Sequence, residues 1–179
     1  MRPVPAGAVT APAIAVREFH PDDAAAVARA LVDSSIHHTE LEPERYAVLD
    51  AESLAARYRA GRQHPSGVPP DERASLVAEV DGVVVGILDV HVATPEGGHR
   101  PYRYGFVAEL AVAAPARGRG AGAALLRAAE DWARARDCAY TVLDYNARNE
   151  LAGRFYRERM GYRPAGVIVV KDLRKAASD

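Results

Sequence analysis

A glycine-rich turn between an apolar strand and a strong helix constrains this chain more than any other feature. Residues 106–126 read FVAELAVAAPARGRGAGAALL, and single residues separate the three glycines, Gly118, Gly120 and Gly122. Glycine permits positive φ and close approach of a ligand, and the free N–H groups of a helix N-terminus attract anions. Arg117 and Arg119 add positive charge. The pattern therefore predicts a phosphate-type anion site at residues 117–122.

The composition is that of an ordinary folded domain, and it excludes several classes of protein. The chain has 179 residues, of which 49% are hydrophobic and 26% charged, and its net charge is −1. A nucleic-acid binder is expected to be strongly basic, so that class is excluded. Cys138 is the single cysteine, which leaves no internal disulfide and no cysteine-built metal site. We therefore expect a reduced, cytoplasmic setting and no metal.

The chain shows no targeting or membrane segment by its sequence. Residues 1–12 contain prolines and no long apolar run, so we expect a disordered N-terminal arm rather than a signal peptide. No apolar run approaches the length of a membrane span. Residues 13–179 are expected to form a single domain.

Hydrophobic periodicity and turn residues predict an α+β (mixed α/β) fold around one central sheet. Asp81-Gly82 between two β-branched runs is typical of a hairpin. Asn149 is placed to cap the last helix. The expected strands cover residues 14–19, 74–80, 83–92, 102–112, 140–145 and 167–173. The expected helices cover residues 24–32, 50–58, 123–136 and 150–160.

Two nucleotide sites compete for the glycine turn on the residues alone. A P-loop needs Lys followed by Ser or Thr after its last glycine, and Ala123-Ala124 stands there instead. The dinucleotide fingerprint fits better in its relaxed form, through Gly118, Gly120 and Ala123. However, about two β-α units of chain follow the turn, and no acidic residue ends a strand about 20 positions later.

Two motifs resemble those of the GNAT superfamily of acyl-CoA-dependent N-acyltransferases. Arg117-x-x-Gly120-x-Gly122 is similar to the Q/R-x-x-G-x-G/A signature of that superfamily, and it follows a strand ending Leu110-Ala111-Val112. LDYNARNELAGRFYRERMGYRP, residues 143–164, resembles its second motif. The resemblance covers about residues 13–173. It implies a mostly antiparallel sheet, splayed between strands 4 and 5, with helices on both faces.

The resemblance also implies acetyl-CoA as cofactor and residues that hold it. The pantetheine arm is expected along the end of the splayed strand, and the diphosphate on the amides of the turn. Asn149 either bonds the cofactor arm or only caps its helix, and both readings stay open. The expected cofactor-binding residues are Leu110, Ala111, Val112, Arg117, Gly118, Arg119, Gly120, Ala121, Gly122, Asn149 and Tyr156.

Two residues are candidates for the chemistry that the resemblance implies. Tyr156 stands at the position of the proton donor to the leaving thiolate in many relatives, although a packing role is the alternative. A phenol, with a pKa of about 10, suits a thiolate of about 8.5. Glu109 is expected to contact the amine, or else to be a solvated or salt-bridged strand carboxylate. His91 is a weaker candidate base, since a lone histidine is more often structural.

The acceptor is expected to be a primary amine of a small molecule or peptide. His37, Glu40 and Glu42 are candidates for the acceptor side, and these carboxylates together with Glu109 favour a cationic acceptor. No nucleic-acid or membrane partner is expected, and a homodimer is common in such folds. Two other functions stay open: a non-catalytic acyl-CoA-binding module and a dinucleotide-dependent oxidoreductase.

Overall fold

The computed structural model describes residues 13–95, 97 and 100–171. They form two compact units that divide between Asp144 and Tyr145. The expected N-terminal arm, residues 1–12, lies outside the described ranges. Within these ranges, none of the helices combines the length and the apolarity that a bilayer crossing requires.

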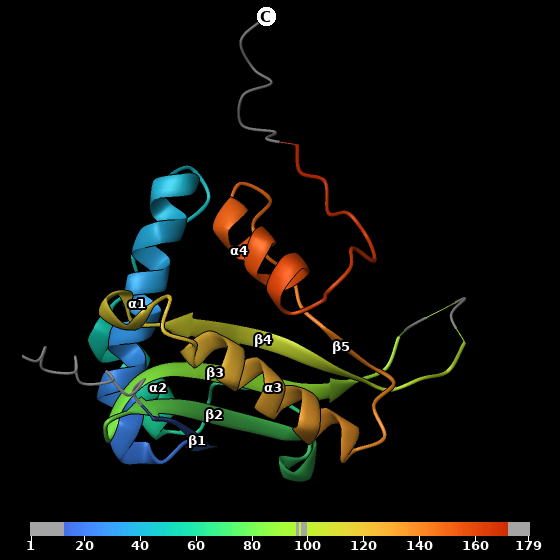
Figure 1. Cartoon of the computed structure of the whole chain (residues 1–179), viewed down its shortest axis with the longest axis horizontal. Coiled ribbons are helices and arrows are strands. Elements are labelled where there is room, and N and C mark those ends of the chain that lie inside the picture. The colour runs from blue at the N-terminus through green and yellow to red at the C-terminus, as the bar shows by residue number, and fades with distance from the viewer. Residues whose placement is uncertain (1–12, 96, 98–99, 172–179) are drawn as a thin grey trace, which may run out of the picture. The chain divides into compact units, whose positions relative to one another are not determined.

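The first unit is built on one five-stranded sheet whose strands follow one another in chain order (Figure 1). The first four strands are antiparallel to their neighbours, and the fifth is parallel to the fourth. This mixed sheet with flanking helices confirms the predicted fold class. The strands are β1 Ile14–Glu18, β2 Arg73–Val80, β3 Val83–Ala93, β4 Tyr104–Val112 and β5 Tyr140–Val142.

Two helices, α1 and α2, pack on one face of this sheet. α1 spans Ala24–Leu41 and α2 spans Ala51–Arg59. Their apolar sides meet the inward side chains of the strands in one core cluster, in which Tyr58 is 1% exposed. The cluster joins these residues: Ala24, Val27, Ala28, Ala30, Leu31, Leu54, Ala55, Tyr58, Val77, Ile87 and Ala111.

The first helix is longer than the sequence indicates. Polar residues interrupt its apolar periodicity after Val32, and we expected the helix to end there. In the structure it continues for nine more residues to Leu41, because no helix breaker occurs before Pro43. Two of its hydroxyl groups bond locally: Ser35 Oγ donates to the Val32 carbonyl oxygen at 2.8 Å, and Thr39 Oγ1 donates to the Ser35 carbonyl oxygen at 2.9 Å.

The opposite face of the sheet carries α3, Ala121–Arg134, which begins two residues earlier than predicted (Figure 1). Its buried side is made of Ala121, Ala123, Leu125, Leu126, Ala129 and Ala133. Small side chains allow a close approach to the strands. A Cβ at Gly105 of β4 would lie 2.9 Å from the Cβ of Ala133, so glycine is required there.

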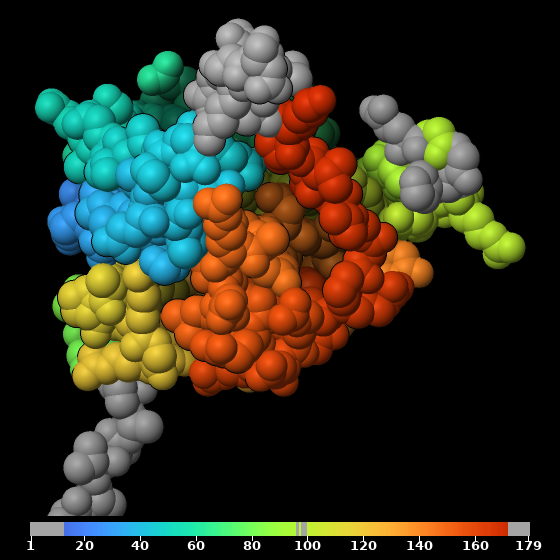
Figure 2. Space-filling view, turned by 90° about the horizontal axis from the view of Figure 1, so that it is seen from above, coloured from blue at the N-terminus to red at the C-terminus, as the bar shows by residue number. Residues whose placement is uncertain are grey.

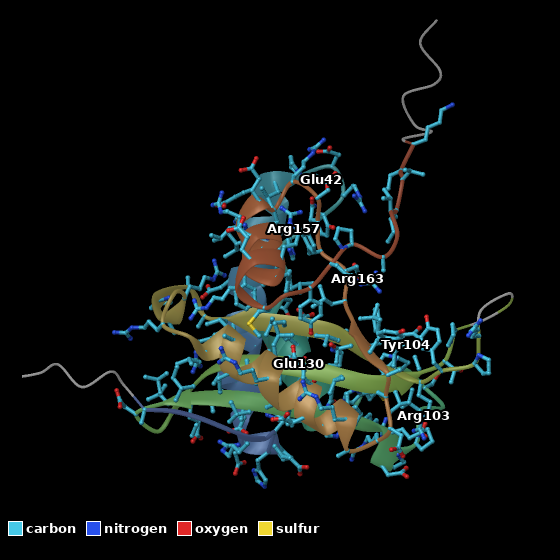
Figure 3. The ribbon with its side chains drawn as sticks, turned by 45° about the vertical axis from the view of Figure 1, so that its right-hand side comes forward. Glu42, Arg103, Tyr104, Glu130, Arg157 and Arg163 are labelled. Atoms are coloured by element: carbon cyan, nitrogen blue, oxygen red, sulfur yellow. The ribbon has the colours of Figure 1, made fainter. Side chains whose placement is uncertain are left out.

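The fourth and fifth strands pair only at their beginnings. Tyr104, Gly105 and Phe106 of β4 pair with Tyr140, Thr141 and Val142. Arg103 and Tyr104 mark this end of β4 in Figure 3. β5 ends at Val142, whereas β4 continues to Val112. The predicted splay is therefore present, and β5 is shorter than the expected strand 140–145.

The second unit contains the last helix. Asn149 caps α4, Glu150–Arg154, by accepting a hydrogen bond from the Ala152 N–H at 3.0 Å. We predicted a regular α-helix over residues 150–160. In the structure the helix widens into a π-helical turn at Phe155–Arg159. π-Helical turns of this kind are frequent at functional sites.

The predicted strand at residues 167–173 is wrong for the part that the structure describes. Residues 163–171 have no strand assigned, and Figure 2 shows atoms of this red segment at the surface. The four aliphatic residues Val167, Ile168, Val169 and Val170 are 63–86% exposed. β-Branched residues favour extended backbone, but a strand exists only where a neighbouring strand supplies hydrogen bonds. Residues 172 and 173 lie outside the described ranges.

Candidate functional site

The glycine turn opens the N-terminus of α3. Gly118 and Gly120 have φ of 75° and 101°, which other residues adopt only with strain. Gly120 is the N-cap, and the first bond into the helix runs from the Ala124 N–H to the Gly120 carbonyl oxygen at 3.0 Å. The N–H groups of Ala121, Gly122 and Ala123 therefore precede the helix ladder and point out of its end. This end favours an anion.

The last residues of β4 turn a set of backbone groups toward the open side of the sheet. The Ala113 N–H donates to the Val85 carbonyl oxygen of β3 at 2.8 Å. Backbone groups alternate in direction along a strand. The N–H and C=O groups of Leu110 and Val112 therefore point away from β3, on the side where β5 has already ended.

Arg117 links this strand end to the turn. Its Nε donates a hydrogen bond to the Val112 carbonyl oxygen at 3.0 Å. The contact confirms that this carbonyl faces outward from β3. It also fixes one guanidinium beside the open helix end, where its charge adds to that of the exposed Arg119.

Glu109 lies on the α1–α2 face, directly across the ladder from Asp89 of β3. The ladder register shifts next to this pair, between Asp89 and Val90, as a β-bulge does. Burial, and secondly the neighbouring Asp89, raise the pKa of Glu109 to about 7, although Arg57 opposes the shift. A carboxyl group of this kind can accept a proton near neutral pH.

Asp89 is the side chain that the sequence interpretation missed. It is 2% exposed, and it accepts hydrogen bonds from Tyr58 Oη at 2.5 Å and from Ser75 Oγ at 2.6 Å. Burial raises its pKa to about 6 despite these two donors. The available signal was an acidic residue in the middle of the apolar run VVVGILDVHV. The two hydroxyl partners come from distant elements and carry no local signal.

His91 lies away from the strand end that carries Leu110 and Val112. It pairs with Phe106, six residues before Val112, which is about 20 Å along a strand. Its ring packs 5.5 Å from that of Phe106, and burial lowers its pKa. The structure therefore does not place this candidate base beside the open strand end.

In the second unit, Tyr156 lies within the π-helical turn. Its ring is 5.4 Å from that of Tyr145 and 6.0 Å from that of Tyr162, so it belongs to an aromatic cluster. Arg157 donates to Tyr145 Oη at 3.0 Å in the same unit. The packing alternative for Tyr156 thus has a structural basis, and the cluster also fixes the phenol in place.

The acceptor-side candidates on the N-terminal side lie at the end of α1. His37 and Glu40 belong to the last turns of α1, and Glu42 is its C-cap residue. Glu42 is buried and pairs with Arg45 at 3.2 Å. Figure 3 shows it at the tip of α1. Among the described residues, no group of three or more His, Cys, Asp or Glu side chains could hold a metal ion.

Comparison with known families and proteins gives a consistent result. The model of the acetyltransferase (GNAT) family matches residues 34–162. A curated relative, the uncharacterised N-acetyltransferase MJ1530 of Methanocaldococcus jannaschii, is 41% identical over 88 residues, which are 49% of this chain and 51% of the relative. The chain thus spans about half the length of this curated relative.

Solved structures share the fold at low sequence identity. The BH1408 protein of Bacillus halodurans, solved as a tetramutant, has a TM-score of 0.76 at 21% identity, covering 89% of this chain and 99% of that one. The aminoglycoside acetyltransferase AAC(6')-Iy, in complex with a bisubstrate analogue of CoA and acetylneamine, has a TM-score of 0.62 at 18% identity. That match covers 89% of this chain and 97% of the other.

Proposed function

This chain belongs to the acetyltransferase (GNAT) family, and we propose that it transfers an acetyl group from acetyl-CoA to a primary amine of a small molecule or peptide. One observation carries the proposal: an open strand end leads directly into a helix N-terminus with free N–H groups. The amine attacks the thioester directly in a ternary complex. A cytoplasmic setting and a homodimer stay predictions.

The open strand end and the turn suit the two halves of the cofactor. The pantetheine amides bond to the outward groups of Leu110 and to the Val112 carbonyl oxygen, as an added strand would, with Ala111 between them. The diphosphate binds the N–H groups of the turn, helped by the helix dipole and two guanidinium groups. The binding residues in the turn are Arg117, Gly118, Arg119, Gly120, Ala121 and Gly122.

The strand end also suits the chemistry at the thioester. Attack by a neutral amine places negative charge on the carbonyl oxygen in the tetrahedral intermediate. The Val112 N–H, which points away from β3, donates to this oxygen. A fixed donor of this kind needs no reorganisation during the reaction.

Glu109 takes the proton that the acceptor must lose. An alkyl ammonium group is protonated at neutral pH, and only the free amine attacks. The pKa of Glu109 near 7 lets it hold that proton under the conditions of the reaction. Its position three residues before Val112 puts it about 10 Å from that residue along the strand, which leaves room for the acceptor.

Tyr156 donates a proton to the leaving thiolate. The support is its position in the second family motif and its place in a π-helical turn. Asn149 has its side-chain oxygen engaged as a helix cap. Its amide nitrogen is the group that bonds to the cofactor arm.

Thiol release from acetyl-CoA tests the proposed function. The acceptors are kanamycin, spermidine, glucosamine 6-phosphate, free amino acids and a peptide with a free N-terminus. We expect turnover with at least one cationic amine. Binding of acetyl-CoA without turnover on any of them contradicts the transferase function and favours the non-catalytic module.

A pair of glycine variants tests the cofactor site separately. Gly118 and Gly67 both have positive φ, 75° and 88°, and a Cβ at either would meet nothing within 4 Å. Alanine therefore strains both turns by a similar amount. We expect Gly118→Ala to weaken acetyl-CoA binding by about tenfold in calorimetry, and Gly67→Ala to leave it unchanged. Equal affinities would remove the turn from the cofactor site.

A further inference from the structure

Asp89 is a buried carboxylate that makes no ion pair with any residue in the described part of the chain. Its two oxygens are held by hydroxyl groups alone, from Tyr58 of α2 and Ser75 of β2. Ser75 is fixed in turn, because its oxygen lies 3.1 Å from Gln63 Nε2 and 3.0 Å from His64 Nε2. The carboxylate is therefore oriented by a chain of hydrogen bonds.

Burying a carboxylate with hydroxyl groups as its only hydrogen-bond partners costs free energy of folding. A buried charge loses its hydration, and neutral hydroxyl donors return only part of that loss. An apolar side chain would fill the same space in the core between α2 and the sheet without that cost. A buried, oriented charge without a counter-charge more often marks a functional site.

The register of the sheet places Asp89 next to Glu109, the residue on which its charge acts. Asp89 and Glu109 are directly opposite in the β3–β4 ladder. Residues opposite in an antiparallel pair project to the same face, with Cβ atoms about 5 Å apart. The adjoining bulge bends β4 beside the pair. The fixed carboxylate thus lies beside Glu109 on the face that α2 covers.

The other groups around the pair compensate its negative charge only in part: Arg57 lowers the pKa of both carboxyl groups, but burial raises both overall. On α2, Tyr58 stays neutral because burial and Asp89 raise its pKa, and Arg57 is exposed with its guanidinium 5.4 Å over the Tyr58 ring. Burial lowers the pKa of His64 to about 4 and also lowers that of His91, so both rings are neutral. Arg73 acts on His64. The buried residues of α1 are not titratable: Ala24, Val27, Ala28, Ala30, Leu31 and Ser35.

We propose that Asp89 is a positioning residue for acetyl transfer: it is a fixed anion, oriented by Tyr58 and Ser75, that acts across the ladder to hold on Glu109 the proton taken from the acceptor. In this step an N–H bond of the ammonium breaks, an O–H bond forms on Glu109, and the electron pair left on nitrogen attacks the thioester. The inference rests on the proposed function, in which Glu109 is the base.

Asp89→Asn tests the inference, because asparagine keeps the shape and can still bond both hydroxyl groups. The readout is the titration of Glu109, followed by NMR of ¹³C-labelled glutamate carboxyl groups and assigned by its loss in Glu109→Gln. We expect Asp89→Asn to lower the pKa of Glu109 by about one unit. With the best amine of the panel, the acid limb of kcat/KM should move to lower pH by the same amount, while KM for acetyl-CoA stays unchanged.

Glu79→Gln is the matched control. Glu79 is also a sheet carboxylate, on β2, but it pairs with Arg17 at 2.6 Å and not with Glu109. This variant should leave the Glu109 titration in place. If Asp89→Asn does not fold, Ser75→Ala removes one donor from Asp89, and the shift should have the same direction and be smaller.

The outcomes separate the inference from the function on which it rests. An unmoved Glu109 titration in a folded Asp89→Asn or Ser75→Ala variant, even with reduced activity, overturns the role of Asp89. Full activity of Glu109→Gln, or no turnover on any amine, contradicts the proposed function instead. In that case the shift in titration still measures the effect of Asp89 on Glu109.

Discussion

The face of the sheet under α3 is packed with alanine and leucine, whereas the face under α1 and α2 encloses charged and hydroxyl groups. α3 approaches so closely that Gly105 has no room for a Cβ. Across the sheet, Asp89, Tyr58 and Ser75 form a buried polar network beside Glu109. Under the proposed function, the first face holds the helix whose end binds the cofactor, and the second holds the groups that move a proton.

The difference between the two faces predicts first that substitutions in the core under α3 mainly change the free energy of unfolding. Leu125 is fully buried between α3 and the sheet. Leu125→Ala should lower the free energy of unfolding by about 3 kcal/mol, through lost burial and a residual cavity. Urea denaturation measures the loss. Leu151→Ala is the control, since Leu151 is 65% exposed and its loss should cost less than about 0.5 kcal/mol.

On the other face, the largest effect should be on activity. Glu109→Gln keeps the size of the side chain and removes the base, so kcat/KM should fall by about a hundredfold and lose its acid limb near pH 7. Steady-state kinetics between pH 5.5 and about 9 would show this. The affinity for acetyl-CoA should not change. An acid limb that persists in the variant assigns the base to another group.

The same carboxyl group should make stability depend on pH. Its pKa is raised from 4.5 in a free side chain to about 7 in the folded protein, so folding favours the protonated form. This contribution is fully present below pH 4.5 and is lost as pH rises through 7. We expect the free energy of unfolding to change by about 2 kcal/mol over this window. This is less than the full pKa shift would give, because the carboxyl group is only half-buried. Urea titrations of wild type and Glu109→Gln should diverge over this window.

Tyr156 belongs to the second unit and gives the smallest expected effect. Tyr156→Phe keeps the aromatic cluster with Tyr145 and removes the proton donor. We expect kcat to fall by about tenfold, while binding of acetyl-CoA changes by less than about twofold. Stopped-flow measurement of thiol release gives kcat, and calorimetry gives the affinity for acetyl-CoA. Unchanged turnover would leave Tyr156 with a packing role only.

Most elements of the fold were predictable, and the errors share a physical cause. The hairpin at Asp81-Gly82 and the helix cap at Asn149 depend on local chemistry, and both are confirmed. The extension of α1 to Leu41 was missed because packing and hydroxyl bonds continue a helix without an apolar repeat. The strand at residues 167–173 was predicted from propensity alone, and its described part has no pairing partner.

The sequence by itself determined the glycine turn, the order of strands and helices as far as α4, and the acetyltransferase family, which the family match confirms. These features follow from short-range steric rules and from motifs contained in single segments. Only the tertiary structure decided that Asp89 lies opposite Glu109 and is held by Tyr58 and Ser75. A pKa depends on burial and on neighbouring charges, and these residues become neighbours only when segments far apart in the chain pack together.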